Sequence, residues 1–177
     1  APAECPSMLI DSLSLLFAFT SFISWFEAAM IAAAFFALIY AITPEPLPEW
    51  TVRIPPTLYF YLQWSWLGYL QLKDAFWPFF IVFNAVLFYI DYRIQEGTFT
   101  VASWVTMHAI MAMPLIYWIG AVWRCSKNCQ SRNWASVARW LTVAAFCDLA
   151  LRWVIYHYFP NIMFSCQQMV IHWGDCI

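Results

Sequence analysis

An acid and a base lie four residues apart inside a long apolar stretch near the end of the sequence: Asp148 and Arg152. In an α-helix, a carboxylate placed four residues before a guanidinium is well oriented for an ion pair on one face. Charges inside a membrane are costly, so such a pair either fixes helix packing or lines a path for protons or ions. The sequence favours the packing role, because a paired charge needs less explanation than a lone one.

Glu27 is the lone acid of another apolar stretch, with no basic residue within one helical turn. At membrane depth, such a carboxylate is protonated, partnered by another helix or subunit, or exposed to water. We therefore treat Glu27 as a candidate proton or cation site. The alternative is that the helix is shifted and that Glu27 lies near the membrane surface.

Small residues follow Glu27 at a spacing of four: Ala29, Ala33, Ala37 and Ala41. This spacing places them on one helix face, about 200° around the helix from Glu27. Small side chains allow another helix to approach closely. The pattern predicts a helix-packing face.

Two histidines, His108 and His157, fall at similar depth in different apolar stretches. His108 lies 16 residues before Arg124, and His157 lies 18 residues after Arg139. At 1.5 Å per residue these separations are about 24 and 27 Å. Two neutral imidazoles at one level can ligate a b-type haem between two helices. The alternative is that each histidine hydrogen-bonds a neighbouring helix or lies among interfacial aromatic rings.

The cysteines divide by their place along the chain. Cys125 and Cys129 have a C-x3-C spacing, which differs from the C-x2-C of common redox and zinc motifs, so we expect free thiols there. Cys166 and Cys176 form a candidate disulfide near the end of the chain. In one straight helix their backbones would be about 15 Å apart, so this bridge requires the segment to fold back. Cys5 is a further candidate partner on the same side if the chain crosses the membrane four times.

The composition places these residues in a membrane. Hydrophobic residues make up 64% of the chain and charged residues only 10%, whereas soluble domains carry about 25% charge. The many aromatic residues, 12 Trp, 9 Tyr and 16 Phe, suit the boundary between lipid and water. A net charge of -2 provides no basic surface for nucleic acid. Membrane lipids are therefore the expected surroundings, and nucleic acid is excluded as a partner.

The apolar runs predict an all-α integral membrane protein, with residues 1–177 forming one bundle of four or five transmembrane helices. A crossing needs roughly 20 apolar residues, and the 27 residues from Gly97 to Trp123 contain no Asp, Glu, Lys or Arg. The predicted spans are 9–43, 57–90, 99–123 and 135–159, followed by a short tail, 160–177.

The span 57–90 is ambiguous because Lys73 and Asp74 interrupt it. It is either one long helix bent near Pro78, with its first part at the membrane surface, or two short spans. We favour the single helix, since a two-residue turn between spans leaves helix ends without hydrogen-bond partners. The proline-rich segment 44–56 before it is expected to be an extended loop outside the membrane.

A basic loop follows the third predicted crossing and contains Arg124, Lys127, Arg132 and Arg139, half of the eight Lys and Arg in the chain. The positive-inside rule places loop 124–139 on the cytoplasmic or matrix side. With four spans, both chain ends lie on the opposite side. With five, the N-terminus moves to the basic side.

These features support three functional hypotheses. The leading one is a non-catalytic subunit that packs against other integral membrane subunits in a larger complex, bioenergetic or transport-related, in an inner or energy-transducing membrane. It rests on the helix-packing features and on the lack of a complete catalytic constellation in the sequence. The second is an electron carrier that holds haem b between His108 and His157. The third is a small oligomeric transporter or channel lined by Glu27, Asp148 and Arg152.

Overall fold

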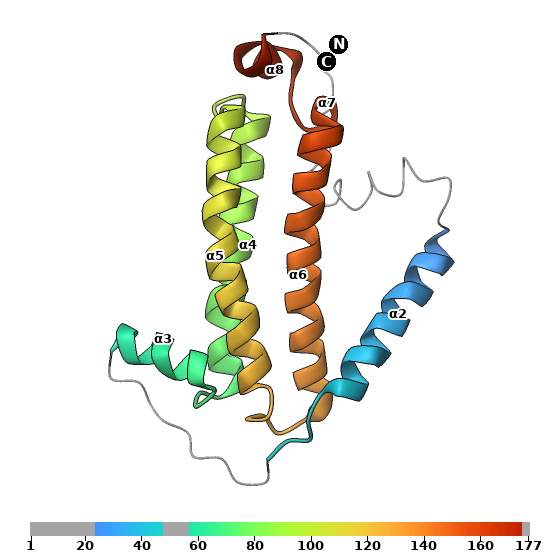
Figure 1. Cartoon of the computed structure of the whole chain (residues 1–177), viewed down its shortest axis with the longest axis vertical. Helices are drawn as coiled ribbons and strands as arrows, with labels where there is room; N and C mark the ends of the chain where they lie inside the picture. The colour runs from blue at the N-terminus through green and yellow to red at the C-terminus, as the bar shows by residue number, and fades with distance from the viewer. Residues whose placement is uncertain (1–23, 48–56, 175–177) are drawn as a thin grey trace.

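The computed structural model describes residues 24–47 and 57–174, and every secondary-structure element in these ranges is a helix. Three long helices, α4 (Leu72–Gln95), α5 (Val101–Cys125) and α6 (Arg132–Tyr158), run side by side (Figure 1). Each is long and apolar enough to cross a membrane. The shorter α2 (Trp25–Ile42) contacts α6 and leans away from the other helices. The chain is therefore an all-helical protein, compatible with a membrane bundle of four helices.

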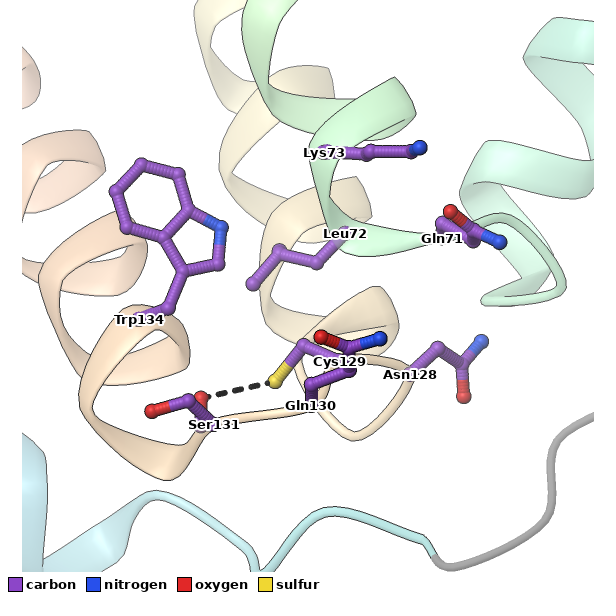
Figure 2. A pocket seen from close by; sticks show the side chains of 8 residues that line it. All are labelled: Gln71, Leu72, Lys73, Asn128, Cys129, Gln130, Ser131 and Trp134. Atoms are coloured by element: carbon purple, nitrogen blue, oxygen red, sulfur yellow. Dashed lines mark hydrogen bonds between the residues drawn. The ribbon is translucent and has the colours of Figure 1, made fainter.

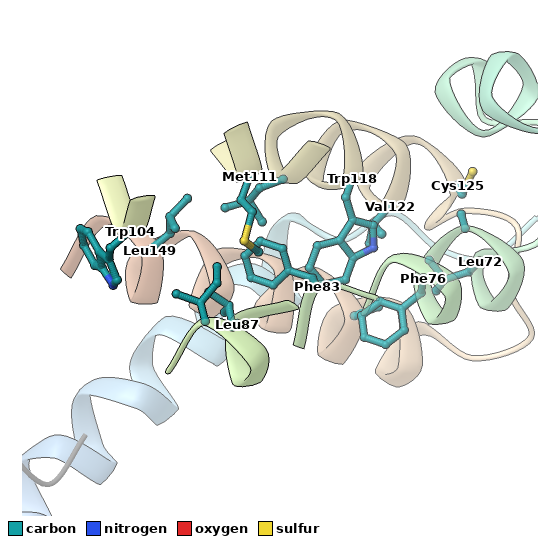
Figure 3. Close-up of a cluster of buried hydrophobic side chains, with 14 of the residues drawn as sticks. Leu72, Phe76, Phe83, Leu87, Trp104, Met111, Trp118, Val122, Cys125 and Leu149 are labelled. Carbon is teal, nitrogen blue, oxygen red and sulfur yellow. The ribbon is translucent and has the colours of Figure 1, made fainter. Parts of the chain in front are cut away.

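Helix α5 is central, because it packs against both α4 and α6. Its buried side chains are spaced alternately by three and four residues, which gathers them into one stripe along the helix. Figure 3 shows part of this stripe against Phe76, Phe83 and Leu87 of α4 and Leu149 of α6. The stripe comprises Val101, Trp104, His108, Met111, Leu115, Trp118, Val122 and Cys125.

The predicted span 57–90 is divided in the structure. A separate helix, α3 (Leu58–Leu67), ends at Gly68, and α4 begins at Leu72, so the chain breaks here instead of bending at Pro78. Ten helical residues rise about 15 Å, which is too short to cross a membrane. Figure 1 shows α3 lying across one end of the bundle. Of the two helices, only α4 is long and apolar enough to cross a membrane.

The turn between α3 and α4 is held by a distant residue. Gly68 ends α3 with a φ of 79°, in the left-handed region that favours glycine. The Nδ2 group of Asn128, in the loop after α5, donates to the carbonyls of Gly68 at 2.7 Å and Leu70 at 3.0 Å. A tight turn between two helices leaves backbone groups without hydrogen-bond partners, which is costly. The Asn128 amide provides partners for two of these carbonyls, so the turn is tolerated.

Pro78 lies inside α4 without ending it. Proline has no N–H, so the carbonyl of Asp74, four residues earlier, loses its helical partner. The Tyr61 hydroxyl of α3 donates to that carbonyl at 2.7 Å. The proline therefore creates an acceptor that attaches α3 to α4.

Two arginines of α6 hold the end of α2. The Nη2 group of Arg132 donates to the carbonyls of Tyr40 at 3.0 Å and Ala41 at 3.3 Å, and Arg139 Nη1 donates to that of Ile42 at 3.2 Å. The last carbonyls of a helix have no partner within the helix, and basic side chains satisfy them well. The basic residues thus anchor α2 by its C-terminal end.

Arg124 does the same for α3. Its Nη1 group donates to the carbonyl of Trp66 at 2.7 Å, and its guanidinium lies 4.1 Å from the centre of the Trp66 rings. The Tyr117 hydroxyl adds a hydrogen bond to the carbonyl of Leu62. These contacts hold α3 against α5.

Two short helices, α7 (Pro160–Met163) and α8 (Cys166–Trp173), lie at the other end of the bundle (Figure 1). The Nε2 group of Gln168 donates to the carbonyls of Ile94 at 3.4 Å and Phe99 at 3.3 Å. The tail thus folds over the turn between α4 and α5.

Candidate functional site

A buried charge cluster, formed by Asp91, Asp148 and Arg152, joins α4 to α6. Arg152 donates through Nη1 and Nη2 to the two carboxylate oxygens of Asp91, at 2.7 and 3.0 Å, and through Nε to Asp148 at 3.0 Å. The side chains of Arg152, Asp91 and Asp148 are 5%, 9% and 29% exposed. The ion pair between Asp148 and Arg152 is present, and Asp91 is a second partner.

The geometry explains why the base is arginine. A guanidinium presents a planar set of donors that bonds one carboxylate with two parallel hydrogen bonds and still has Nε for another. A lysine ammonium has no such fork. With all three groups charged, two carboxylates and one guanidinium leave a formal charge of −1 in the cluster.

The charge cluster lies closer to the end covered by α7 and α8 than to the basic end. Asp91 is four residues before the last residue of α4, and Arg152 is six before the last residue of α6. At 1.5 Å per residue these positions are about 6 and 9 Å inside the helix ends. The cluster is therefore one to two helical turns inside that end of the bundle.

His108 is fully buried on the central stripe of α5, within electrostatic reach of the charge cluster. Its Nδ1 lies 2.9 Å from the carbonyl of Trp104, and the two side-chain rings stack with centroids 3.9 Å apart. A carbonyl only accepts, so Nδ1 carries a proton and donates it. The Nε2 atom has no hydrogen-bond partner among the described residues. Phe164 then covers Trp104, with ring centroids 5.7 Å apart.

The structure does not bring the two histidines together around a space. His157 is exposed on α6 and meets the Tyr158 ring edge-on at 5.0 Å, whereas His108 is enclosed under Trp104. Neither the cavity beside Gln71 and Ser131 nor the one beside Phe83 and Trp118 has His108 or His157 in its wall. The residues present therefore do not fit a haem, and we derive no chemistry through one.

Glu27 lies at the start of α2 and not in the middle of a helix. Its carboxylate accepts from the backbone N–H of Ser24 at 2.7 Å, and its own N–H donates to the Ser24 hydroxyl at 3.2 Å. This reciprocal arrangement is a capping box, which satisfies two N–H groups at a helix start. The structure gives Glu27 a local partner and a capping role.

The cysteines are found in different states. Cys125 and Cys129 are free and buried, and Cys147 is free and exposed. Cys166 is disulfide-bonded. Cys5 and Cys176 lie outside the described residues, so the pairing of Cys166 with Cys176 stays a prediction.

Asp91 is a site residue that the sequence analysis does not identify, because it directly follows the predicted span 57–90. Its spacing contains the missing signal. Asp91 is four residues after Leu87 and three before Ile94, and all three side chains are buried. Helical periodicity therefore places the acid on the packed face of α4.

Comparison of the chain with protein-family models, with curated proteins and with solved structures finds no match.

Proposed function

We propose that this protein is a non-catalytic integral subunit of a larger membrane complex, and that α2 is the helix by which it contacts a neighbouring subunit. The observation that supports this most directly is the exposure of the small-residue face of α2. All four alanines spaced by four on this helix are exposed.

The contact of α2 with its own chain lies toward its C-terminal end. Ile39 and Thr43 are buried, at 4% and 2% exposed, whereas Phe26 and Phe35 are 74% and 54% exposed. Lipid tails gain little from small residues on a helix, but a second helix gains close backbone approach. An exposed alanine face on a helix anchored at one end is therefore suited to a partner helix.

The proposal includes the membrane in which the protein lies and its orientation there. We place the protein in an inner or energy-transducing membrane, with loop 124–139 on the cytoplasmic or matrix side. The charge of this loop supports the orientation, because short basic loops are retained on that side.

Cross-linking in native membranes tests the contact. With Cys147→Ser as background, Ala33→Cys should form a discrete cross-link to another membrane protein. Phe35→Cys is the matched control, because it is about 200° around the same helix. Equal cross-linking from both positions, or cross-links only to another copy of this chain, would contradict the proposal.

Blocking the alanine face should also dissociate the complex. Ala33→Leu is expected to reduce co-purification of the partner at least fivefold, because the larger side chain prevents close helix approach. Phe35→Leu should leave co-purification unchanged. Quantitative mass spectrometry of the detergent-solubilised material measures both.

A second candidate function, proton binding or transport within the membrane, is favoured by one observation. The Nε2 atom of His108, which has no hydrogen-bond partner within 24–47 and 57–174, is an acceptor buried within electrostatic reach of a cluster with a formal charge of −1. A proton taken up there would neutralise the combined charge, and buried ionisable residues mark proton paths in many membrane proteins.

Proteoliposomes distinguish the two functions. If His108 conducts protons, the purified protein should dissipate an imposed pH gradient, His108→Gln should abolish this, and His157→Gln should not. A wild-type protein that leaves the gradient intact rules out the proton-transport function and leaves the subunit proposal in place.

A further inference from the structure

A cavity of about 350 Å³ opens at the basic end of the bundle. The charge cluster lies toward the opposite ends of the same two helices, α4 and α6. Figure 2 shows it between the first turn of α4, the loop after α5 and the first turn of α6. Liquid water occupies about 30 Å³ per molecule, so the space is sufficient for a small polar group. Its polar side chains include those of Gln71, Lys73, Gln130 and Ser131.

The cavity wall has a positive bias. Lys73 brings an ammonium group, and none of the lining residues is acidic. The neighbouring Asp74 is not part of the wall. Such a wall favours an anion.

Two helix N-termini meet at this cavity. Gln71 is the N-cap of α4 and Ser131 is the N-cap of α6, and neither side chain makes a capping hydrogen bond. The first N–H groups of a helix carry a partial positive charge and lack helical partners. In α4, however, the N–H of Leu72 donates to the carbonyl of Asn128 at 3.2 Å and that of Asp74 to the carbonyl of Gln71 at 3.1 Å, so the start of α6 is the better donor. Oxygen atoms of phosphate groups are good acceptors for such N–H groups.

The three arginines described at this end are already used, and the exposed Lys127 lies outside the cavity wall. Arg124, Arg132 and Arg139 bind backbone carbonyls of α3 and α2. The Cys129 thiol in the cavity wall donates to the carbonyl of Ser131 at 3.1 Å, and burial raises its pKa, so it adds no negative charge near neutral pH. Lys73 is therefore the cation of the wall that is available to an anion.

Apolar side chains complete the wall beside Asn128, whose amide already donates to Gly68 and Leu70. Leu72 forms its buried side, and the half-buried Trp134 stacks on Trp77 with ring centroids 6.2 Å apart. Basic pockets between transmembrane helices with apolar surroundings bind anionic lipid headgroups on the cytoplasmic or matrix side. The same donors suit a free phosphate ion.

We propose that this cavity binds a phosphate group, either the headgroup phosphate of an anionic phospholipid or inorganic phosphate. Lys73 neutralises its charge, and the polar side chains with the N-terminus of α6 donate hydrogen bonds to its oxygens.

The test measures binding to the full-length, delipidated protein in detergent by native mass spectrometry. The probes are phosphatidylglycerol, phosphatidylcholine as zwitterionic comparison, and inorganic phosphate. Lys73→Gln should weaken phosphatidylglycerol or phosphate binding at least fivefold. The matched control is Lys127→Gln, which removes an exposed cation of the same end outside the cavity and should change binding less than twofold.

A second pair of variants separates the site from general effects of charge. Gln130→Glu places a carboxylate at the cavity and should weaken binding as strongly as Lys73→Gln. Gln95→Glu adds the same charge at the other end of α4 and should not. Thermal melting of each variant confirms that it is folded.

The outcomes also identify the source of the phosphate. Saturable phosphatidylglycerol binding that millimolar phosphate does not displace indicates the lipid headgroup. Binding of phosphate alone, with displacement of the lipid, indicates the free ion. Equal effects of Lys73→Gln and Lys127→Gln, equal binding of both lipids, or no binding by any probe would overturn the proposal.

Discussion

Replacing Arg152 with alanine is expected to lower the free energy of unfolding by about 3 to 5 kcal/mol, the range found when one partner of a buried ion pair is removed. Asp91, whose side chain is 9% exposed, would lose both hydrogen bonds from its guanidinium partner, and Asp148 would lose one. Two carboxylates would then remain between α4 and α6 without a counter-ion. Equilibrium denaturation in detergent micelles measures the change.

Arg93 provides the control at the same end of α4. It donates to the hydroxyls of Thr98 at 2.7 Å and Tyr89 at 3.0 Å, and its side chain is half-buried. Arg93→Ala should cost about 1 to 2 kcal/mol, since no buried carboxylate is left unpaired. If Arg152→Ala costs no more than Arg93→Ala, the charge cluster does not hold the helices together.

A neutral version of the charge cluster separates structure from function. Combining Asp91→Leu, Asp148→Leu and Arg152→Met should cost far less than Arg152→Ala alone, because apolar groups of similar volume can replace a buried ion network at little cost. A stable triple variant that also supports complex assembly assigns the cluster to packing. One that is stable but loses activity in the pH-gradient assay assigns it to proton handling.

Gly68→Ala is expected to destabilise the protein by about 2 to 5 kcal/mol, for two reasons. A side chain at a φ of 79° costs about 1 to 2 kcal/mol. The added Cβ would also lie 3.1 Å from the carbonyl oxygen of Arg124 and 3.2 Å from its Cβ, so the end of α5 must move, and overpacking of this kind costs about 1 to 3 kcal/mol. Thermal or chemical denaturation measures the loss.

Gly97→Ala is the matched control for this prediction. Gly97 has a φ of 66°, but a Cβ built on it would meet nothing within 4 Å. Its substitution should cost only the conformational part, about 1 to 2 kcal/mol. Equal losses at Gly68 and Gly97 would show that the close approach of the α3–α4 turn to α5 contributes nothing.

The helices with strong apolar runs were predictable from the sequence, because a membrane crossing depends on length and composition. Helix α5 corresponds to the predicted span 99–123, and helix α6 corresponds to the predicted span 135–159. The break after α3 was not predictable locally. It depends on the Asn128 amide, 60 residues away from Gly68 in the chain, which satisfies the turn.

In the charge cluster too, the contact between residues close in the sequence was predictable, and the contact between distant residues was not. The pair of Asp148 and Arg152 follows from helical spacing alone. The partnership with Asp91 spans 61 residues and requires knowledge of which faces of α4 and α6 meet. Residue spacing predicts the height of His108 and His157 along their helices, but not the direction in which each side chain points. His108 points into the core and is buried, whereas His157 is exposed.

The arginine contacts at the basic end have a consequence for pH. Each pairs a guanidinium with main-chain carbonyls, which have no proton to gain or lose. These arginine contacts therefore do not depend on a carboxylate or an imidazole that changes charge near neutral pH. Near neutral pH, a change of stability with pH is therefore expected to begin at groups other than these three arginines, and the contacts that they make should persist while those groups titrate.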